Sequence, residues 1–155
     1  MKIIVTYVPA KAIAIMELMG EDIDERQLEQ RANELESYHH LRVRFSPEQK
    51  GIDFLKFGSN DPQISHQRLQ HLNSFFNTDL TLIDGKDTLP CVLHHFERTY
   101  KLTGYGDVSL LFEKQHKGTV SNLQLIYNDQ LFQLGELRFN IDSEKIHQLS
   151  KLTIN

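Results

Sequence analysis

The sequence predicts an α+β fold: an antiparallel β-meander, either sandwich-like or a partial barrel, with helices from the N-terminal half packed on one face. Two observations predict this class. Residues 79–141 contain five apolar runs separated by turn-forming residues, which is typical of antiparallel strands. In residues 1–77 the apolar residues mostly recur at the spacing of an α-helix, and the sequence has no regular strand-helix-strand alternation. We expect one domain over residues 1–155, helix-rich over 1–77, with the meander at 79–141 and a short C-terminal helix over 142–152.

The first elements are expected to be a strand and two helices. Lys2–Val8 is rich in β-branched residues and predicts a strand that ends at Pro9. Ala10–Met19 predicts a helix that is mostly buried, because its apolar side chains cover more than one helical face. Asp24 is the expected N-cap of an amphipathic helix that follows.

The period then changes from helix to strand. Over His39–Ser46, apolar and polar residues alternate, so that one face carries Leu41, Val43 and Phe45 and the other carries His40, Arg42 and Arg44. Ile52–Phe57 predicts a second strand after a turn. Asp61 and Pro62 are typical of a helix start and predict a third helix, which reaches about Asn77.

The meander is expected to contain strands over Asp79–Ile83, Thr88–Tyr100, Val108–Lys114, Val120–Tyr127 and Leu131–Ile141. An Asp-Gly pair at Asp84 and Gly85 predicts a hairpin between the first two strands. Because proline cannot donate a hydrogen bond to a neighbouring strand, we expect Pro90 at the start of a strand, on an edge or at a bulge. Ser143 is the expected start of the terminal helix.

Composition excludes some chemistry and disfavours more. The net charge of −4 gives no global basic field, so nucleic acid is not an expected partner. The single cysteine, Cys91, allows neither an intrachain disulfide nor a multi-thiolate zinc site, and its apolar neighbours predict a buried thiol. No apolar run approaches the roughly 20 residues of a membrane span.

One metal site is conceivable from the residue types. On the strand over Thr88–Tyr100, His95 and Glu97 lie on the same face, and His40 lies on the polar face of another strand. These nitrogen and oxygen ligands suit zinc, which is the alternative to our expectation that the protein binds no cofactor. The competing interpretation is an exposed ladder in which Arg42, Arg44 and Glu97 pair across strands, and the sequence favours this one.

A binding surface is the preferred interpretation of the remaining polar residues. Arg42 and Arg44 lie on the polar face of their strand, and Tyr105 and Asp107 lie in a glycine-containing connector between two strands. We therefore expect these four residues to contribute to binding. The connector lacks the glycine and lysine spacing of a phosphate-binding loop.

Leu89–Tyr100 followed by Tyr105–Glu113 resembles small exported lipoproteins of unknown function from Bacteroidota. The resemblance implies export through a lipid-modified cysteine upstream of this sequence, and it implies no catalytic residue. The expected location is the cell envelope if such a signal was removed, and the cytoplasm otherwise.

Together these observations favour a non-enzymatic binding or assembly module that acts on a protein partner through a sheet edge or an exposed loop. The alternative is a metal-dependent enzyme that uses His40, His95 and Glu97. A third hypothesis is a homo-oligomer that pairs through the apolar N-terminal helix, over Ala10–Met19.

Overall fold

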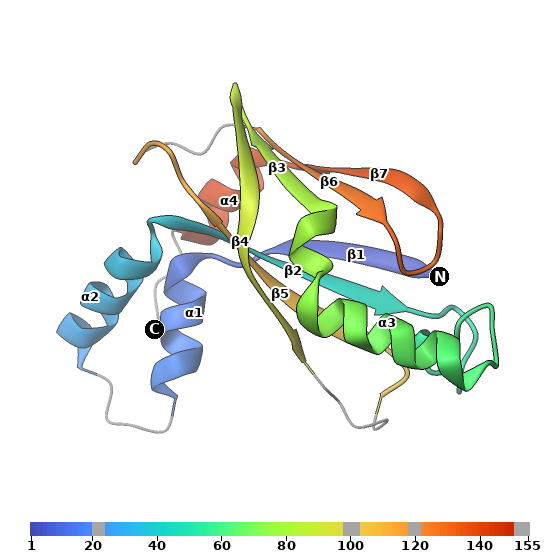
Figure 1. The fold of residues 1–155 in the computed structure, drawn as a ribbon. Helices are drawn as coiled ribbons and strands as arrows, with labels where there is room; N and C mark the ends of the chain where they lie inside the picture. Colours follow the sequence, from blue (N-terminus) through green and yellow to red (C-terminus); the bar gives the residue numbers. More distant parts are fainter. Residues whose placement is uncertain (20–23, 98–102, 118–121, 151–155) are drawn as a thin grey trace.

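The computed structural model describes residues 1–19, 24–97, 103–117 and 122–150. It confirms the α+β class with an antiparallel sheet (Figure 1). The elements in chain order are β1 (Lys2–Tyr7), α1 (Ala10–Leu18), α2 (Glu25–Leu35), β2 (Tyr38–Ser46), η1 (Phe54–Lys56), α3 (Pro62–Ser74), η2 (Phe76–Asp79), β3 (Leu80–Asp84), β4 (Asp87–Glu97), β5 (Gly106–Glu113), β6 (Leu123–Asp129), β7 (Gly135–Ile141) and α4 (Ser143–Ser150).

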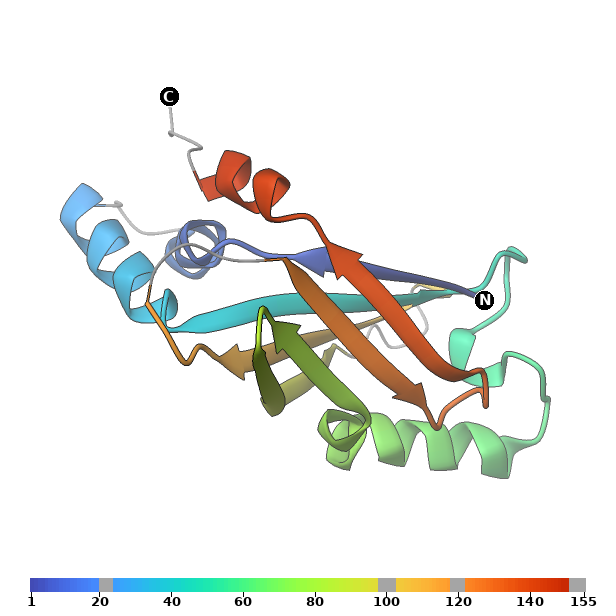
Figure 2. The same cartoon turned by 90° about the horizontal axis from the view of Figure 1, so that it is seen from above.

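The seven strands form one sheet in the order β1-β2-β5-β4-β3-β6-β7, and every neighbouring pair is antiparallel. β3, β4 and β5 are consecutive in the chain and adjacent in the sheet. The β6–β7 hairpin then pairs with β3, and β2 pairs with β5. The sheet curves until it is nearly closed and barrel-like, which Figures 1 and 2 show from two directions.

A bulge in β4 contributes to this curvature. The first part of β4 pairs with β3 up to Pro90, and the part from Cys91 onward pairs with β5. The register shifts between Cys91 and Leu93, so one extra residue is inserted there. A bulge bends its strand and increases the local twist. Pro90 is tolerated because β4 pairs only with β3 at that point, as the sequence predicts for an edge or a bulge.

The main core fills the inside of the curved sheet, and Phe45 is at its centre. The Phe45 ring is fully buried and lies 5.7–6.1 Å, between ring centroids, from four other aromatic rings: Phe54, Phe76, Tyr127 and Phe132. Such aromatic contacts stabilise a core beyond the area that they bury. The prediction that Leu41, Val43 and Phe45 share one apolar face of β2 is confirmed, since all three side chains are buried.

The helices occupy two separate positions. α3 and η2 contribute Leu72 and Phe76 to the main core, whereas α1 and α2 form a second cluster around Ala14, Leu28 and Leu35. Figures 1 and 2 show α1 and α2 side by side at one end of the sheet. The prediction that the first helix is mostly buried is wrong. In α1 only Ala14 is buried, because the helix packs through one side.

The predicted strand over Ile52–Phe57 is also wrong, because this segment contains the short helix η1. The Asp53 side chain accepts a hydrogen bond from the Leu55 backbone N–H and so caps the turn. Phe54 is the one buried anchor, and its ring occupies the space where a side chain at position 106 would lie. Gly106 is therefore required for this contact.

Other boundaries differ slightly from prediction. β5 begins at Gly106, so Asp107 belongs to the strand and not to the connector. Asp79 lies in η2 and not in β3. The predicted strand residues 98–100 and 120–121, and the predicted helix residues 151–152, lie outside the described residues.

Replacing Phe45 by Ala is expected to lower the free energy of unfolding by about 3–5 kcal/mol, because it leaves a cavity among four rings. Urea unfolding followed by circular dichroism measures this value. Phe75→Ala is the matched control, since it is the same chemical change at a side chain that is 51% exposed. A loss below about 1 kcal/mol is expected there. Equal losses for the two variants would contradict this core.

Candidate binding surface

The outer face of the sheet, opposite the main core, brings together the predicted binding residues. In the ladder of β2, β5 and β4, Arg44 lies opposite Asp107, and Asp107 lies opposite Glu97. In the next row Arg42 lies opposite Ser109, and Ser109 lies opposite His95. Side chains of directly paired residues lie on the same face of a sheet, so these rows form one continuous polar surface.

Arg44, Tyr105 and Asp107 form a bonded unit on this face, which we call the Arg44 cluster. Arg44 donates from Nε to Asp107 Oδ1 and from Nη2 to Oδ2, at 2.7 Å in each case. Its guanidinium carbon lies 4.0 Å from the centre of the Tyr105 ring. The hydrogen bonds with Asp107 raise the pKa of Arg44. Asp107 is only 5% exposed, so both its oxygens depend on this bidentate contact.

Arg42, the fourth predicted binding residue, is next to the cluster but has a different environment. Its Nε atom is buried and has no hydrogen-bond partner within the described part of the chain. A buried donor without an acceptor costs about 1–3 kcal/mol, so this arrangement requires an explanation.

The predicted zinc ligands are not assembled. His40 is in the row of Leu111, His95 in the row of Ser109 and Glu97 in the row of Asp107. His40 Nε2 donates to the Leu35 carbonyl oxygen at 3.2 Å, and Glu97 Oε1 accepts from the Ser109 hydroxyl at 3.3 Å. No group of three or more His, Cys, Asp or Glu among residues 1–19, 24–97, 103–117 and 122–150 is arranged to hold a metal ion.

Cys91 is a buried thiol, as its neighbours predict. It is 5% exposed, and burial raises its pKa to about 11. Very little thiolate is present at neutral pH, which is the opposite of what a nucleophilic cysteine requires.

Sequence reasoning missed a buried polar network inside the sheet. His39 is fully buried and its Nε2 donates to Asp84 Oδ2 at 2.9 Å, while the Tyr7 hydroxyl lies 3.4 Å from Nδ1. Burial lowers the pKa of His39 although the bond to Asp84 opposes this, and burial raises the pKa of Tyr7 to about 12. The only sequence signal was a histidine on the apolar face of β2.

A second missed pair joins α3 to η2. His71 Nε2 donates to Asp79 Oδ2 at 2.6 Å, and Asp79 is 6% exposed. Burial raises the pKa of Asp79, and the bond from His71 opposes that effect. A separation of eight positions between these two residues fits no metal or catalytic motif, so the sequence alone gave no reason to select them.

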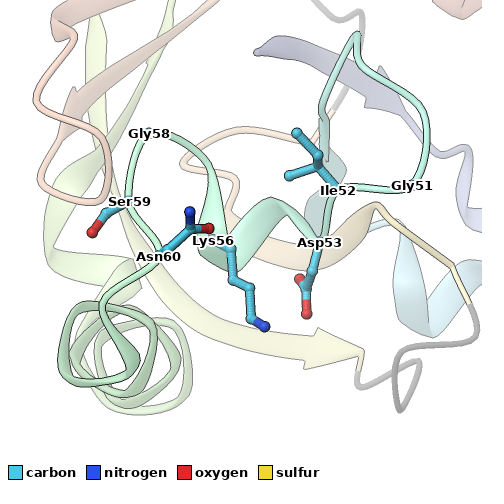
Figure 3. A pocket seen from close by; sticks show the side chains of 7 residues that line it. All are labelled: Gly51, Ile52, Asp53, Lys56, Gly58, Ser59 and Asn60. Carbon is cyan, nitrogen blue, oxygen red and sulfur yellow. The ribbon is translucent and has the colours of Figure 1, made fainter.

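One hollow of about 540 Å³ is formed by the segment between β2 and α3 (Figure 3). Its lining residues are Gly51, Ile52, Asp53, Lys56, Gly58, Ser59 and Asn60. All of them come from one short stretch of chain, and Asp53 is already used as a helix cap. In a typical binding site, polar groups from several parts of the chain point into one pocket. No distant element contributes a polar group to this hollow, so it does not resemble such a site.

Comparison with protein-family models, curated proteins and solved structures gives no match to this chain. Among the helices that the structure describes, none has the length and apolar character needed to cross a bilayer.

Stability is expected to fall as the pH is lowered, in part through His39. Its pKa in the folded protein is below the ordinary 6.5, so folding favours the neutral ring, and this contribution is fully present above pH 6.5. It is lost as the pH falls from 6.5 through the lowered pKa, by at most about 1.4 kcal/mol per pH unit.

Urea unfolding of the protein at several values between pH 7.5 and 5 measures this slope. His39→Gln should be less stable at pH 7.5 and should show a shallower slope. His66→Gln, at an exposed position of α3, should keep the original slope. A slope that His39→Gln leaves unchanged would show that His39 is not a source of the pH dependence.

Proposed function

We propose that the protein is a non-enzymatic binding module and that the outer face of β1, β2, β5 and β4 binds a protein partner. The observation that carries the proposal is Arg42, whose buried Nε has no acceptor in the described residues. A polar group that costs stability in the free protein is explained if its partner arrives with the ligand. The unassembled His40, His95 and Glu97 leave the metal-dependent enzyme without a comparable observation.

The Arg44 cluster supports binding because its geometry is already fixed. Arg44 is held by two hydrogen bonds and by the Tyr105 ring, yet its side chain is still 36% exposed. Arginine and tyrosine are enriched among the residues that dominate protein interfaces. An arginine that is ordered before binding loses less conformational entropy when the complex forms.

Apolar side chains lie around the polar rows. Leu93 is 61% exposed, Val92 is 48% exposed at the bulge, and Ile4 on β1 is 37% exposed. Covering such side chains contributes about 25 cal/mol for each Å² of apolar surface removed from water. A polar centre with apolar neighbours on an open sheet face suits a protein surface better than a small molecule, which prefers a concave site.

Local charge indicates what the partner presents. Arg44 neutralises Asp107, and Glu97 lies one row from Arg42 and accepts a bond from Ser109. Arg42 has a buried Nε without an acceptor and makes no ion pair within the described residues, so the partner is expected to place a carboxylate against its guanidinium. A second copy of this chain is disfavoured, because a two-fold axis at the centre of this face would bring the two Arg42 residues close together.

The resemblance of Leu89–Glu113 to exported lipoproteins favours a partner in the cell envelope.

Site-specific photocrosslinking in cells of the source organism tests the proposal. A benzoylphenylalanine at position 93 should give a discrete adduct with a protein whose crosslinked segment contains Asp or Glu, identified by mass spectrometry. The same probe at position 134 is the matched control, since Leu134 is also an exposed leucine (47%) but lies in the β6–β7 connection. It should not give that adduct.

Arg42→Gln should reduce the adduct from position 93 about tenfold or more, because a charge-assisted hydrogen bond is lost. Equal yields of this adduct from positions 93 and 134 would count against the proposal. An unchanged yield from position 93 in Arg42→Gln would also count against it. An adduct of twice the chain mass would show self-association in place of a separate partner. Recovery of no adduct at position 93 would also overturn the proposal.

A further inference from the structure

The β6–β7 connection passes close to one end of α3 (Figure 2). Side chains of these two segments line a cleft that is distinct from the outer face. It has a volume of about 710 Å³, within the range of ligand sites in proteins. Three separate segments line it: residues 57–59, the side of α3 that carries Arg68 and His71, and residues 130–133. Unlike the hollow near Gly51, it collects side chains from distant parts of the chain.

Arg68 is fixed at this cleft by neutral groups. It donates from Nε to Leu131 O at 2.9 Å and from Nη1 to Leu55 O at 2.8 Å and Phe57 O at 2.7 Å. Its guanidinium carbon lies 4.6 Å from the centre of the Phe132 ring. None of these partners is a carboxylate, and Nη2 makes no hydrogen bond within the described residues.

The charge of Arg68 is therefore held in a partly buried place without a bonded counter-ion. Burial lowers the pKa of Arg68, which shows the cost of this position for the charged form. Asp129 is the nearby acid, but it already accepts hydrogen bonds from the Tyr127 hydroxyl and from the backbone N–H groups of Leu131, Phe132 and Leu134. An anion in the cleft would supply the missing partner.

His71 follows Arg68 by three positions on α3, so the two side chains lie on the same side of the helix. Its Nε2 is used by Asp79, which leaves Nδ1 as the ring nitrogen available to a ligand. Across the cleft, Gln133 has a φ of 59°, which is unusual for a residue other than glycine. Backbone strain of this kind is frequent at ligand sites.

We infer that this cleft binds a small organic carboxylate with an apolar body. The carboxylate accepts from Arg68 Nη2 and from the Nδ1–H that His71 carries when both of its ring nitrogens are protonated. The apolar body contacts Phe57, Ile64 and Phe132, which also line the cleft. A single carboxylate matches the charge of Arg68, which is bonded only to carbonyl groups, and a guanidinium recognises a carboxylate with strong charge-assisted hydrogen bonds.

Titration of the ¹⁵N-labelled protein with 4-phenylbutyrate, monitored by amide chemical shifts, tests the inference. The carboxylate should shift amides of residues 57–59, 67–71 and 130–133 and should bind at least about tenfold more tightly than the neutral 4-phenylbutyramide. Equal affinity of acid and amide, shifts confined to other regions, or no binding by either compound would overturn it. This comparison uses the unaltered protein and does not depend on a variant that must fold.

Variants then test the assignment of residues. His71→Gln should weaken binding of 4-phenylbutyrate about tenfold, whereas His66→Gln, on an exposed position of the same helix, should leave the affinity unchanged. Arg42→Gln should also have no effect, which separates this site from the outer face. Inorganic phosphate that produces the same shifts at the same concentration would show a general anion site and would contradict the choice of a carboxylate.

Discussion

The bulge in β4 between Cys91 and Leu93 is the constraint on which the rest of the structure depends. It lies just beyond the point at which β4 changes its partner from β3 to β5, and a bulge there bends the strand and helps the sheet to curve. The curved sheet encloses the aromatic core around Phe45 and leaves its outer face to polar residues. The bulge also exposes Val92 at the border of that face.

The inside and the outside of the sheet satisfy their polar groups differently. Inside, His39 is paired with Asp84, and Asp79 is paired with His71, so these side chains are explained by the fold itself. Outside, Arg44 and Asp107 satisfy each other, but the Nε of Arg42 does not find an acceptor among the described residues. This difference is the reason why we propose that the outer face binds the partner, and the ligand site proposed in the cleft beside α3 does not depend on it.

Local patterns in the sequence predicted local features well. Strict alternation over His39–Ser46 identified both faces of β2, and the Asp61-Pro62 pair identified the start of α3, where Asp61 accepts from the Gln63 N–H. Ile52–Phe57 was misassigned because a single buried ring, Phe54, sets its conformation, and one anchor defines no period. Arg44 and Asp107 were both selected as binding residues, but their contact joins positions 63 apart and follows only from the strand order. The hydrogen bond between His39 and Asp84 also joins residues far apart in the sequence, so no local pattern predicted it.

The central claim is that the Arg42 guanidinium serves a partner and not the fold. The free energy of unfolding of Arg42→Met, compared with that of the unaltered protein by urea denaturation, tests this most directly. Methionine keeps an apolar stem of similar length and removes the donor that lacks an acceptor, so stability should stay the same or rise by about 1 kcal/mol. A loss of more than about 1 kcal/mol would show that the fold itself uses the charge, and would contradict the account.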